Sequence, residues 1–116
     1  MIKQALGRQG EELAASYLQA QGYLILTRNY RCREGEIDII CEVGRTLVFV
    51  EVKTRRSLTF GSPEEAVTLR KQDTIRRVAM HWLREQQMYR RDLRFDVVSI
   101  LLTGEEPKLS HIKNAF

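Results

Sequence analysis

Residues 35–55, GEIDIICEVGRTLVFVEVKTR, contain two apolar runs that are separated by Val43 and Gly44. Runs of this length that are rich in Ile, Val and Phe predict two β-strands, over residues 36–42 and 46–54, joined as a hairpin. Asp38, Glu51 and Lys53 lie inside these runs. Because charged side chains lose hydration in a protein interior, charges in the most apolar segment indicate either mutual pairing or a function.

The turn of this hairpin is expected at Val43 and Gly44, as a two-residue loop. Side chains of a strand alternate between the two faces of its sheet, so the turn decides which residues share a face. One face is expected to carry the charges: Glu36, Asp38, Ile40, Phe49, Glu51 and Lys53. The other face is apolar and is expected to pack on a helix: Ile37, Ile39, Cys41, Val48, Val50 and Val52.

In this register Asp38 and Glu51 are diagonal neighbours, about 7–8 Å apart at the backbone, and their side chains can converge on one ion. Like charges in a partly buried sheet repel each other and lose hydration, and a hard divalent cation such as Mg²⁺ relieves both costs. Lys53 would then contact a substrate phosphate, as metal-assisted phosphodiester hydrolysis requires. The alternative is an internal ion-pair cluster of Asp38, Glu51 and Lys53.

The rest of the chain predicts an α/β domain that spans residues 1–116. Helical spacing of apolar residues predicts a first helix over residues 4–21. SPEE, residues 62–65, has the Ser, Pro and Glu of a helix start, and the second helix is expected to run to about Gln87, with a restart at Thr68 as the alternative. Further strands are expected at 23–30, 93–102 and 108–114, with RCREG, residues 31–35, as a loop.

Composition narrows the function classes. No apolar run is long enough to span a membrane, and the first residues lack the apolar core of a signal peptide, so a cytoplasmic protein is expected. The net charge of +4 permits nucleic-acid binding without requiring it. Cys32 and Cys41 lack the spacing of zinc ligands. A homodimer is compatible with the sequence, which shows no specific signature of one.

GEIDII followed by FVEVKTR resembles the D-(x)n-(D/E)-x-K signature of the PD-(D/E)XK nuclease superfamily. GRQGEELAASYL and GY before this signature, and FGSPEEAV and RKQ after it, are similar to the bacterial YraN-like family within that superfamily. The resemblance covers nearly the whole chain. It implies a restriction-endonuclease-like fold with three layers, a mixed central sheet flanked by helices, similar to archaeal Holliday junction resolvases.

The resemblance also implies roles for individual residues. The Asp and Glu of the signature, here Asp38 and Glu51, would bind Mg²⁺ or Mn²⁺ with help from the backbone carbonyl of Val52, and Lys53 would assist the attacking water. The proline that often precedes the aspartate is Ile37 here. An acidic residue of the first helix often completes such a site. Glu11 is the candidate, because it lies closer to the apolar stripe of the helix than Glu12 does.

Several cations are candidates for contacts with nucleic acid. Lys71 falls on the inward side of the second helix, where a phosphate or the carboxylates would compensate its charge, so we count it also as a candidate catalytic residue. The alternative is a lysine that extends along the edge of the core. The full set for nucleic-acid contact is Arg28, Arg31, Arg33, Arg55 and Lys71.

These observations favour a Mg²⁺-dependent nuclease that acts on DNA rather than RNA, with branched or damaged DNA among the candidate substrates. One alternative is a nucleic-acid-binding module that has the nuclease fold and no significant catalysis. Another is a protein-interaction domain. His81 and His111 match no nucleophile pattern and are expected to be non-catalytic, and Trp82 is expected in the core.

Overall fold

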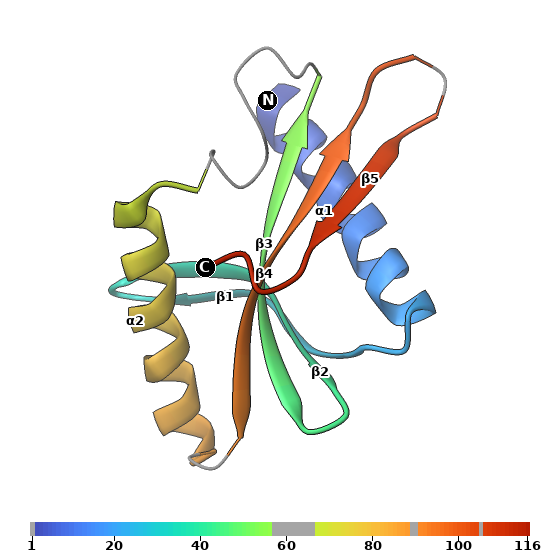
Figure 1. Cartoon of the computed structure of the whole chain (residues 1–116). Coiled ribbons are helices and arrows are strands. Elements are labelled where there is room, and N and C mark those ends of the chain that lie inside the picture. Colours follow the sequence, from blue (N-terminus) through green and yellow to red (C-terminus); the bar gives the residue numbers. More distant parts are fainter. Residues whose placement is uncertain (1, 57–66, 89–90, 105) are drawn as a thin grey trace.

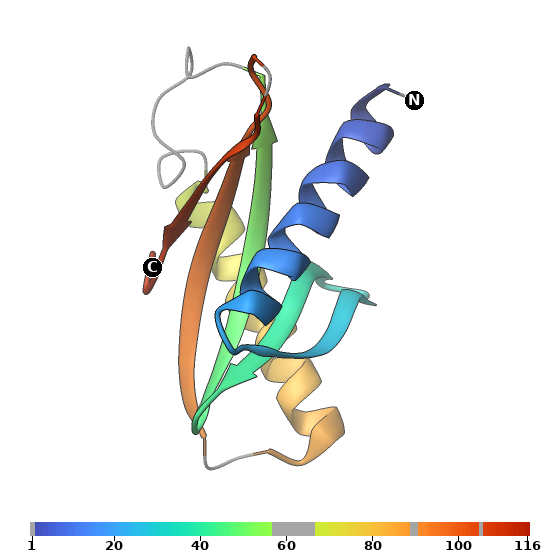
Figure 2. The same cartoon turned by 90° about the vertical axis from the view of Figure 1, so that its right-hand side faces the viewer.

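A five-stranded sheet lies between two helices in the computed structural model, α1 on one face and α2 on the other (Figures 1 and 2). The structure describes residues 2–56, 67–88, 91–104 and 106–116. The mixed α/β architecture predicted from the sequence is therefore confirmed. The elements are α1 (Ile2–Ala20), β1 (Leu24–Cys32), β2 (Gly35–Val43), β3 (Thr46–Arg55), α2 (Leu69–Gln86), β4 (Asp92–Leu101) and β5 (Lys108–Ile112).

The strands follow one another across the sheet in the order β1-β2-β3-β4-β5. Every neighbouring pair is antiparallel except β3 and β4, which are parallel. Parallel neighbours need a connection that crosses a face of the sheet, and α2 lies in that connection. No helix among the described residues combines the length and the apolar character that crossing a membrane requires.

Apolar side chains of the central strands point alternately to the two faces of the sheet, and each face has its own hydrophobic core. Val48 and Val50 of β3 pack toward α1, whereas Leu47 and Phe49 pack toward α2. The cluster on the α1 side also contains Ala14, Ala15, Leu18, Tyr23, Ile39, Cys41, Val98 and Ile100. The cluster on the α2 side also contains Ile37, Ile40, Val67, Ile75, Val78, Ala79, Trp82, Leu83 and Val97. The core positions expected for Cys41 and Trp82 are confirmed.

Two element boundaries differ from the prediction. β1 continues to Cys32 and β2 begins at Gly35, so the expected loop of residues 31–35 shrinks to the turn between them. The predicted helix start at residues 62–65 lies outside the described residues. The described helix begins at Leu69, and the Thr68 hydroxyl accepts a hydrogen bond from the backbone N of Lys71, 3.2 Å away, as an N-cap does.

The predicted turn of the β2–β3 hairpin was wrong by one residue. Val43 pairs with Thr46, which places the two-residue turn at Gly44 and Arg45. Gly44 has a φ of 58°, and the favoured two-residue hairpin turns require a positive φ at their first position. The pairing shifts by two residues, so each residue of one strand keeps its face but changes its neighbour across the hairpin.

The faces of the β1–β2 hairpin reverse near Asn29 and Asp38. Arg28 pairs with Ile39, which packs on the α1 side, whereas Tyr30 pairs with Ile37 and both pack on the α2 side. Regular alternation would keep these two pairs on one face. The expectation that Ile37 shares the apolar face of Ile39 was therefore wrong.

Candidate active site

The two carboxylates of the signature meet where the β2–β3 ladder ends. Its last pair is Ile39 with Val50, so Asp38 and Glu51 are the next residues on the two strands. The Asp38 carboxylate accepts a hydrogen bond from the backbone N–H of Val52 at 2.8 Å. If the ladder continued, the N–H of Val52 would donate to a backbone carbonyl of β2. The side chain of Asp38 takes the place of that carbonyl. The pair of Asp38 and Glu51 is called the carboxylate pair below.

Burial and mutual repulsion disfavour two negative charges here. Burial raises the pKa of Glu51 to about 7, aided by the charge of Asp38, while the charges of Lys71 and Lys53 act against this rise. Burial also raises the pKa of Asp38, with a further contribution from the charges of Glu11 and Glu36. Only 7% of Glu51 is exposed, so water screens little of this repulsion.

The two candidate lysines influence the carboxylates from different elements. Lys53 is two residues after Glu51 on β3 and is partly buried, and Lys71 lies in the first turn of α2. Among the described residues, neither lysine forms an ion pair with the carboxylate pair. The structure therefore does not provide the close contacts on which the ion-pair alternative depends.

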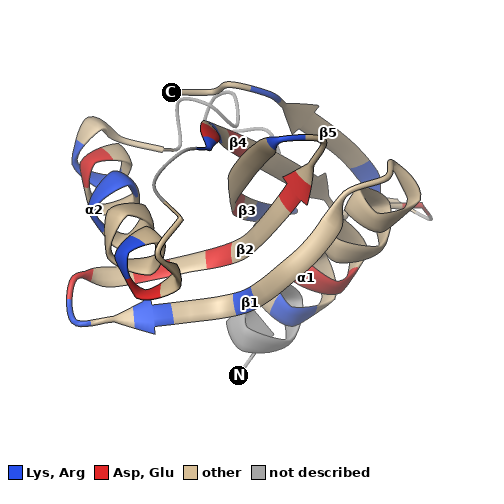
Figure 3. Cartoon of the chain, turned by 90° about the horizontal axis from the view of Figure 1, so that it is seen from below, with Lys and Arg blue, Asp and Glu red and all other residues tan. Residues whose placement is uncertain are grey.

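Glu11 approaches the carboxylate pair from α1. Its side chain is 13% exposed, whereas that of Glu12 is 68% exposed, so Glu11 is the inward acid as predicted. Glu11 Oε1 accepts hydrogen bonds from Asn29 Nδ2 at 2.8 Å and from Arg28 Nη2 at 3.3 Å. Charged positions of α1 and β1 lie side by side in Figure 3.

A hollow of about 580 Å³ opens at this place, on the α1 side of the sheet, and its lining includes Glu11, Asn29, Asp38 and Val52. In a strand the N–H and C=O of one residue point toward the same neighbouring strand. Because the N–H of Val52 points toward Asp38, its carbonyl oxygen points into the same gap, beyond the end of the ladder. Carboxylate and carbonyl oxygens are thus gathered at one edge of the hollow.

This set of donors fits Mg²⁺ better than it fits a softer metal. Among the described residues, no group of three or more His, Cys, Asp and Glu side chains forms a ready-made cage for a metal. Mg²⁺ does not need one, because it retains several waters and is commonly held by one or two carboxylates. Asp38 and Glu51, with the Val52 carbonyl, would supply the protein ligands.

The candidate nucleic-acid contacts lie in different environments. Arg33 is exposed in the β1–β2 turn, and Arg31 is exposed and pairs with Glu36 at 3.0 Å. Arg55 is partly buried at the end of β3. Arg28 differs, because Glu12 and Glu11 engage its guanidinium and raise its pKa. Lys71 lines a second hollow of about 500 Å³, on the α2 side of the hairpin.

A second buried acid, Asp96 of β4, was not singled out from the sequence. Its carboxylate accepts hydrogen bonds from Arg94 at 2.9 Å and from the backbone N of Asn114 at 3.0 Å, and it lies 2.7 Å from His111 Nε2. The Tyr17 hydroxyl lies 2.9 Å from His111 Nδ1. The signal in the sequence was an aspartate inside LRFDVVSILL, the same kind of signal that identified Asp38. We call Asp96 and these partners the Asp96 cluster.

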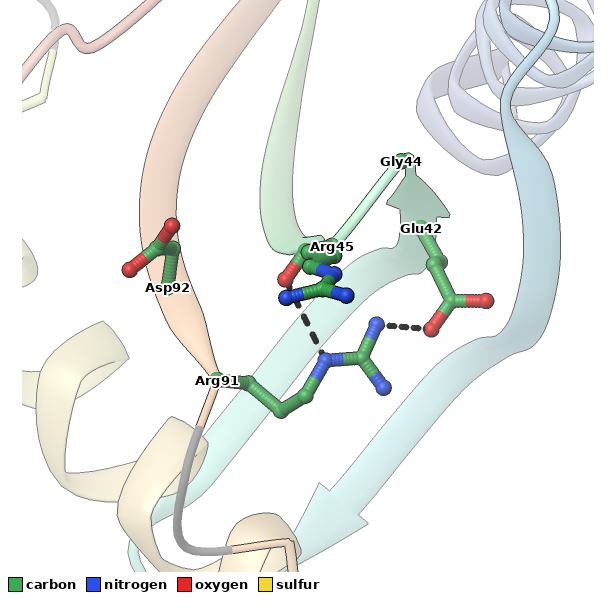
Figure 4. A pocket seen from close by; sticks show the side chains of 5 residues that line it. All are labelled: Glu42, Gly44, Arg45, Arg91 and Asp92. Carbon is green, nitrogen blue, oxygen red and sulfur yellow. Dashed lines mark hydrogen bonds and ion pairs between the residues drawn. The ribbon is translucent and has the colours of Figure 1, made fainter.

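Another hollow, of about 610 Å³, lies at the opposite end of β3 from Glu51, beside the β2–β3 turn (Figure 4). Arg91 lies across it, with its guanidinium bonded to Glu42 and its Nε 3.2 Å from the carbonyl oxygen of Arg45. These contacts tie the turn to the start of β4. They indicate a structural role for this end of the sheet.

Comparison with known proteins identifies the family. The model of the family described as "Uncharacterised protein family UPF0102" matches residues 10–100. A UPF0102 protein of Nocardia farcinica is 54% identical over 115 residues, which cover 98% of this chain and 91% of that protein. A UPF0102 protein of Syntrophomonas wolfei is 50% identical over 115 residues, covering 99% of this chain and 100% of that protein. The chain therefore belongs to the UPF0102 family, the YraN-like family that its sequence resembles.

Proposed function

We propose that this protein is a Mg²⁺- or Mn²⁺-dependent nuclease of the PD-(D/E)XK superfamily that hydrolyses phosphodiester bonds in DNA. The carboxylate pair supports this proposal most strongly. Two repelling carboxylates meet at the end of a ladder, and among the described residues neither forms an ion pair. A divalent cation would remove the repulsion, which makes this arrangement costly without metal and favourable with it.

The roles proposed for the side chains follow from their positions. Asp38 and Glu51 would hold the cation, which when bound supplies a Lewis acid for attack on the phosphodiester. Lys53 is on the same strand as Glu51, and its ammonium would orient water or stabilise negative charge on the phosphate. Lys71 would contact a neighbouring phosphate from α2. The restriction-endonuclease-like fold belongs to the same proposal, since the mixed sheet between two helices is compatible with it.

DNA is the proposed substrate because the net charge is +4 and the sequence in and beside the hairpin is rich in arginine. Arg31 and Arg33 are exposed at the tip of the β1–β2 hairpin and suit contacts with the phosphate backbone. Each phosphate that is neutralised on duplex DNA should add about 0.9 to the log–log slope of binding against salt. Binding that does not respond to salt would argue against a nucleic-acid role.

The test is cleavage of linear, nicked, flapped and four-way DNA by the full chain with Mg²⁺ or Mn²⁺. We expect cleavage that Asp38→Asn and Lys53→Ala each reduce by at least about 100-fold, in the range reported for loss of an electrostatic catalytic group. Asp73→Asn is the control, because Asp73 is an exposed acid of α2 that pairs with Arg77. Binding without cleavage would favour the binding module, and the absence of both would favour an interaction domain.

A further inference from the structure

Asn29 has a backbone conformation that is unusual for the middle of a strand. Its φ is 54°, in the left-handed region that asparagine tolerates better than most residues do. The hairpin faces reverse at this residue, between the pair Arg28–Ile39 and the pair Tyr30–Ile37. Such backbone strain persists only where the surrounding structure enforces it, and it is concentrated at functional sites.

The contacts of Asn29 and Arg28 converge on one atom of Glu11. Asn29 Nδ2 and Arg28 Nη2 both donate to Oε1, at 2.8 Å and 3.3 Å. Among the described residues, no hydrogen bond involves the other oxygen, Oε2. Glu11 lines the same hollow as Asp38. One oxygen of Glu11 is thus anchored, and the other remains available to a ligand in the hollow.

Arg28 adds a second unusual feature. Its Nε is buried and has no hydrogen-bond partner among the described residues. An unsatisfied buried donor costs stability, and the arginine keeps this position while bridging Glu11 and Glu12. Two neighbouring residues therefore each carry a local cost, and the contact that they share is the one with Glu11.

Electrostatics explain why Glu11 needs to be held. Its charge repels Asp38, and an unrestrained side chain on the surface of a helix would rotate toward water. Two donors on Oε1 oppose this rotation, and the Arg28 cation offsets part of the negative charge. Groups that orient a metal ligand in this way commonly contribute 10- to 100-fold to metal affinity.

We propose that Arg28 and Asn29 are positioning residues, which hold Glu11 through Oε1 so that Oε2 accepts a hydrogen bond from a water bound to the cation of Asp38 and Glu51. This inference rests on the metal-dependent function proposed above. The left-handed Asn29 thereby gains a role, and Arg28, predicted from the sequence to contact nucleic acid, gains a different one.

The test uses Asn29→Gly, because glycine adopts a positive φ without strain and the substitution removes the amide alone. The matched control is Asn114→Gly, which replaces another asparagine of positive φ, 56°, at the far end of the chain. The dissociation constant for Mn²⁺ is measured by titration calorimetry on the full chain. We expect about tenfold weaker binding for Asn29→Gly and unchanged binding for Asn114→Gly. Equal affinities for both variants would overturn the inference.

A double-mutant cycle separates a role through Glu11 from a general effect on the fold. Glu11→Gln should weaken Mn²⁺ binding, and adding Asn29→Gly in that background should change the affinity no further. Independent, additive losses would overturn the inference. If the wild type binds Mn²⁺ and Asp38→Asn abolishes binding, the proposed function stands whatever Asn29→Gly does. A wild type that binds no Mn²⁺ would refute both.

Discussion

The carboxylate pair and the Asp96 cluster are both buried in the sheet, and they differ in how their charge is neutralised. Asp96 is fully buried, and burial alone would raise its pKa, but bonds from His111, Arg94 and the Asn114 backbone outweigh burial and lower it. Asp38 and Glu51 have raised pKa values, and within the described part of the chain the pair accepts one hydrogen bond, from Val52. The chain thus compensates one buried acid fully and leaves two others in mutual repulsion, which distinguishes a structural cluster from a candidate site.

The largest effect should come from breaking the compensated cluster. Asp96→Asn removes the anion that Arg94 and His111 share, and we expect a loss of roughly 3–5 kcal/mol in the free energy of unfolding. Urea unfolding at neutral pH measures it. Asp92→Asn, an exposed acid on the same strand, is the control and should stay within about 0.5 kcal/mol of the wild type. If the two variants were equally stable, Asp96 would have no structural role.

The carboxylate pair and the Asp96 cluster should also contribute to the pH dependence of the stability with opposite signs. The pKa of Glu51 is about 7 in the folded protein and 4.5 when unperturbed, so the native state binds more protons between these values. Stability should therefore fall as pH rises through this window, by an amount on the order of 3 kcal/mol. Asp96 has a lowered pKa, and its contribution is lost instead as pH falls below its unperturbed value of 3.8.

Chemical unfolding of the metal-free protein at a series of pH values tests this contrast. Glu51→Gln should remove the contribution of Glu51 to the fall in stability between about pH 4.5 and 7, so that the remaining fall comes from Asp38, whose pKa is also raised, and the acid limb due to Asp96 stays unchanged. The same slope in both proteins would show that Glu51 ionises as freely when folded as when unfolded.

A smaller effect is expected where α1 meets β3. A Cβ on Gly10 would lie 1.9 Å from Thr54 Oγ1, so Gly10→Ala should displace α1 and cost about 1–3 kcal/mol. The displaced helix carries Glu11, and Mn²⁺ binding should weaken as well. Gly7→Ala is the control, because nothing lies within 4 Å of its Cβ, and it should stabilise the protein by about 0.5–1 kcal/mol. Thermal unfolding of both variants decides whether the close approach is required.

The smallest effect separates metal binding from ion pairing at the carboxylate pair. Asp38→Asn removes one of two repelling charges and keeps an acceptor for the Val52 N–H, so the metal-free variant should be at least as stable as the wild type. Mg²⁺ at tenfold over its Kd should stabilise the wild type by about 1.4 kcal/mol and leave the variant unchanged. A strongly destabilised variant with a wild type indifferent to Mg²⁺ would establish the ion-pair alternative.

The sequence predicted the elements well, because their signals are local. Alternating apolar residues marked β2 and β3 to within about one residue, and helical spacing marked α1. The turn was misplaced because Val43–Gly44 and Gly44–Arg45 both supply a glycine, and only the pairing of Val43 with Thr46 decides between them. Because the register moved by two, Asp38 and Glu51 are no longer diagonal neighbours and instead are the residues that directly follow the last pair of the ladder.

A charged residue inside an apolar strand correctly indicated a buried polar cluster. It did not indicate whether that cluster is a structural one or a candidate functional site. Asp38 and Asp96 both interrupt apolar runs, and nothing near either one in the sequence tells them apart. The difference lies in partners that come from other elements. Asp96 meets His111 from β5, whereas Asp38 meets Glu51 and the charge of Glu11.

The sequence by itself determined the strands, the helices, the acidic signature and the inward place of Glu11, because each depends on residues within a few positions of one another. Tertiary structure alone decided which side chains of β1 reach α1. A register shift between Ile25 and Thr27 and the left-handed Asn29 bring Arg28 and Asn29 to Glu11, 17 and 18 residues away in the chain. One inserted residue in a strand exchanges its two faces, and the packing of the whole sheet against α1 selects where that insertion falls.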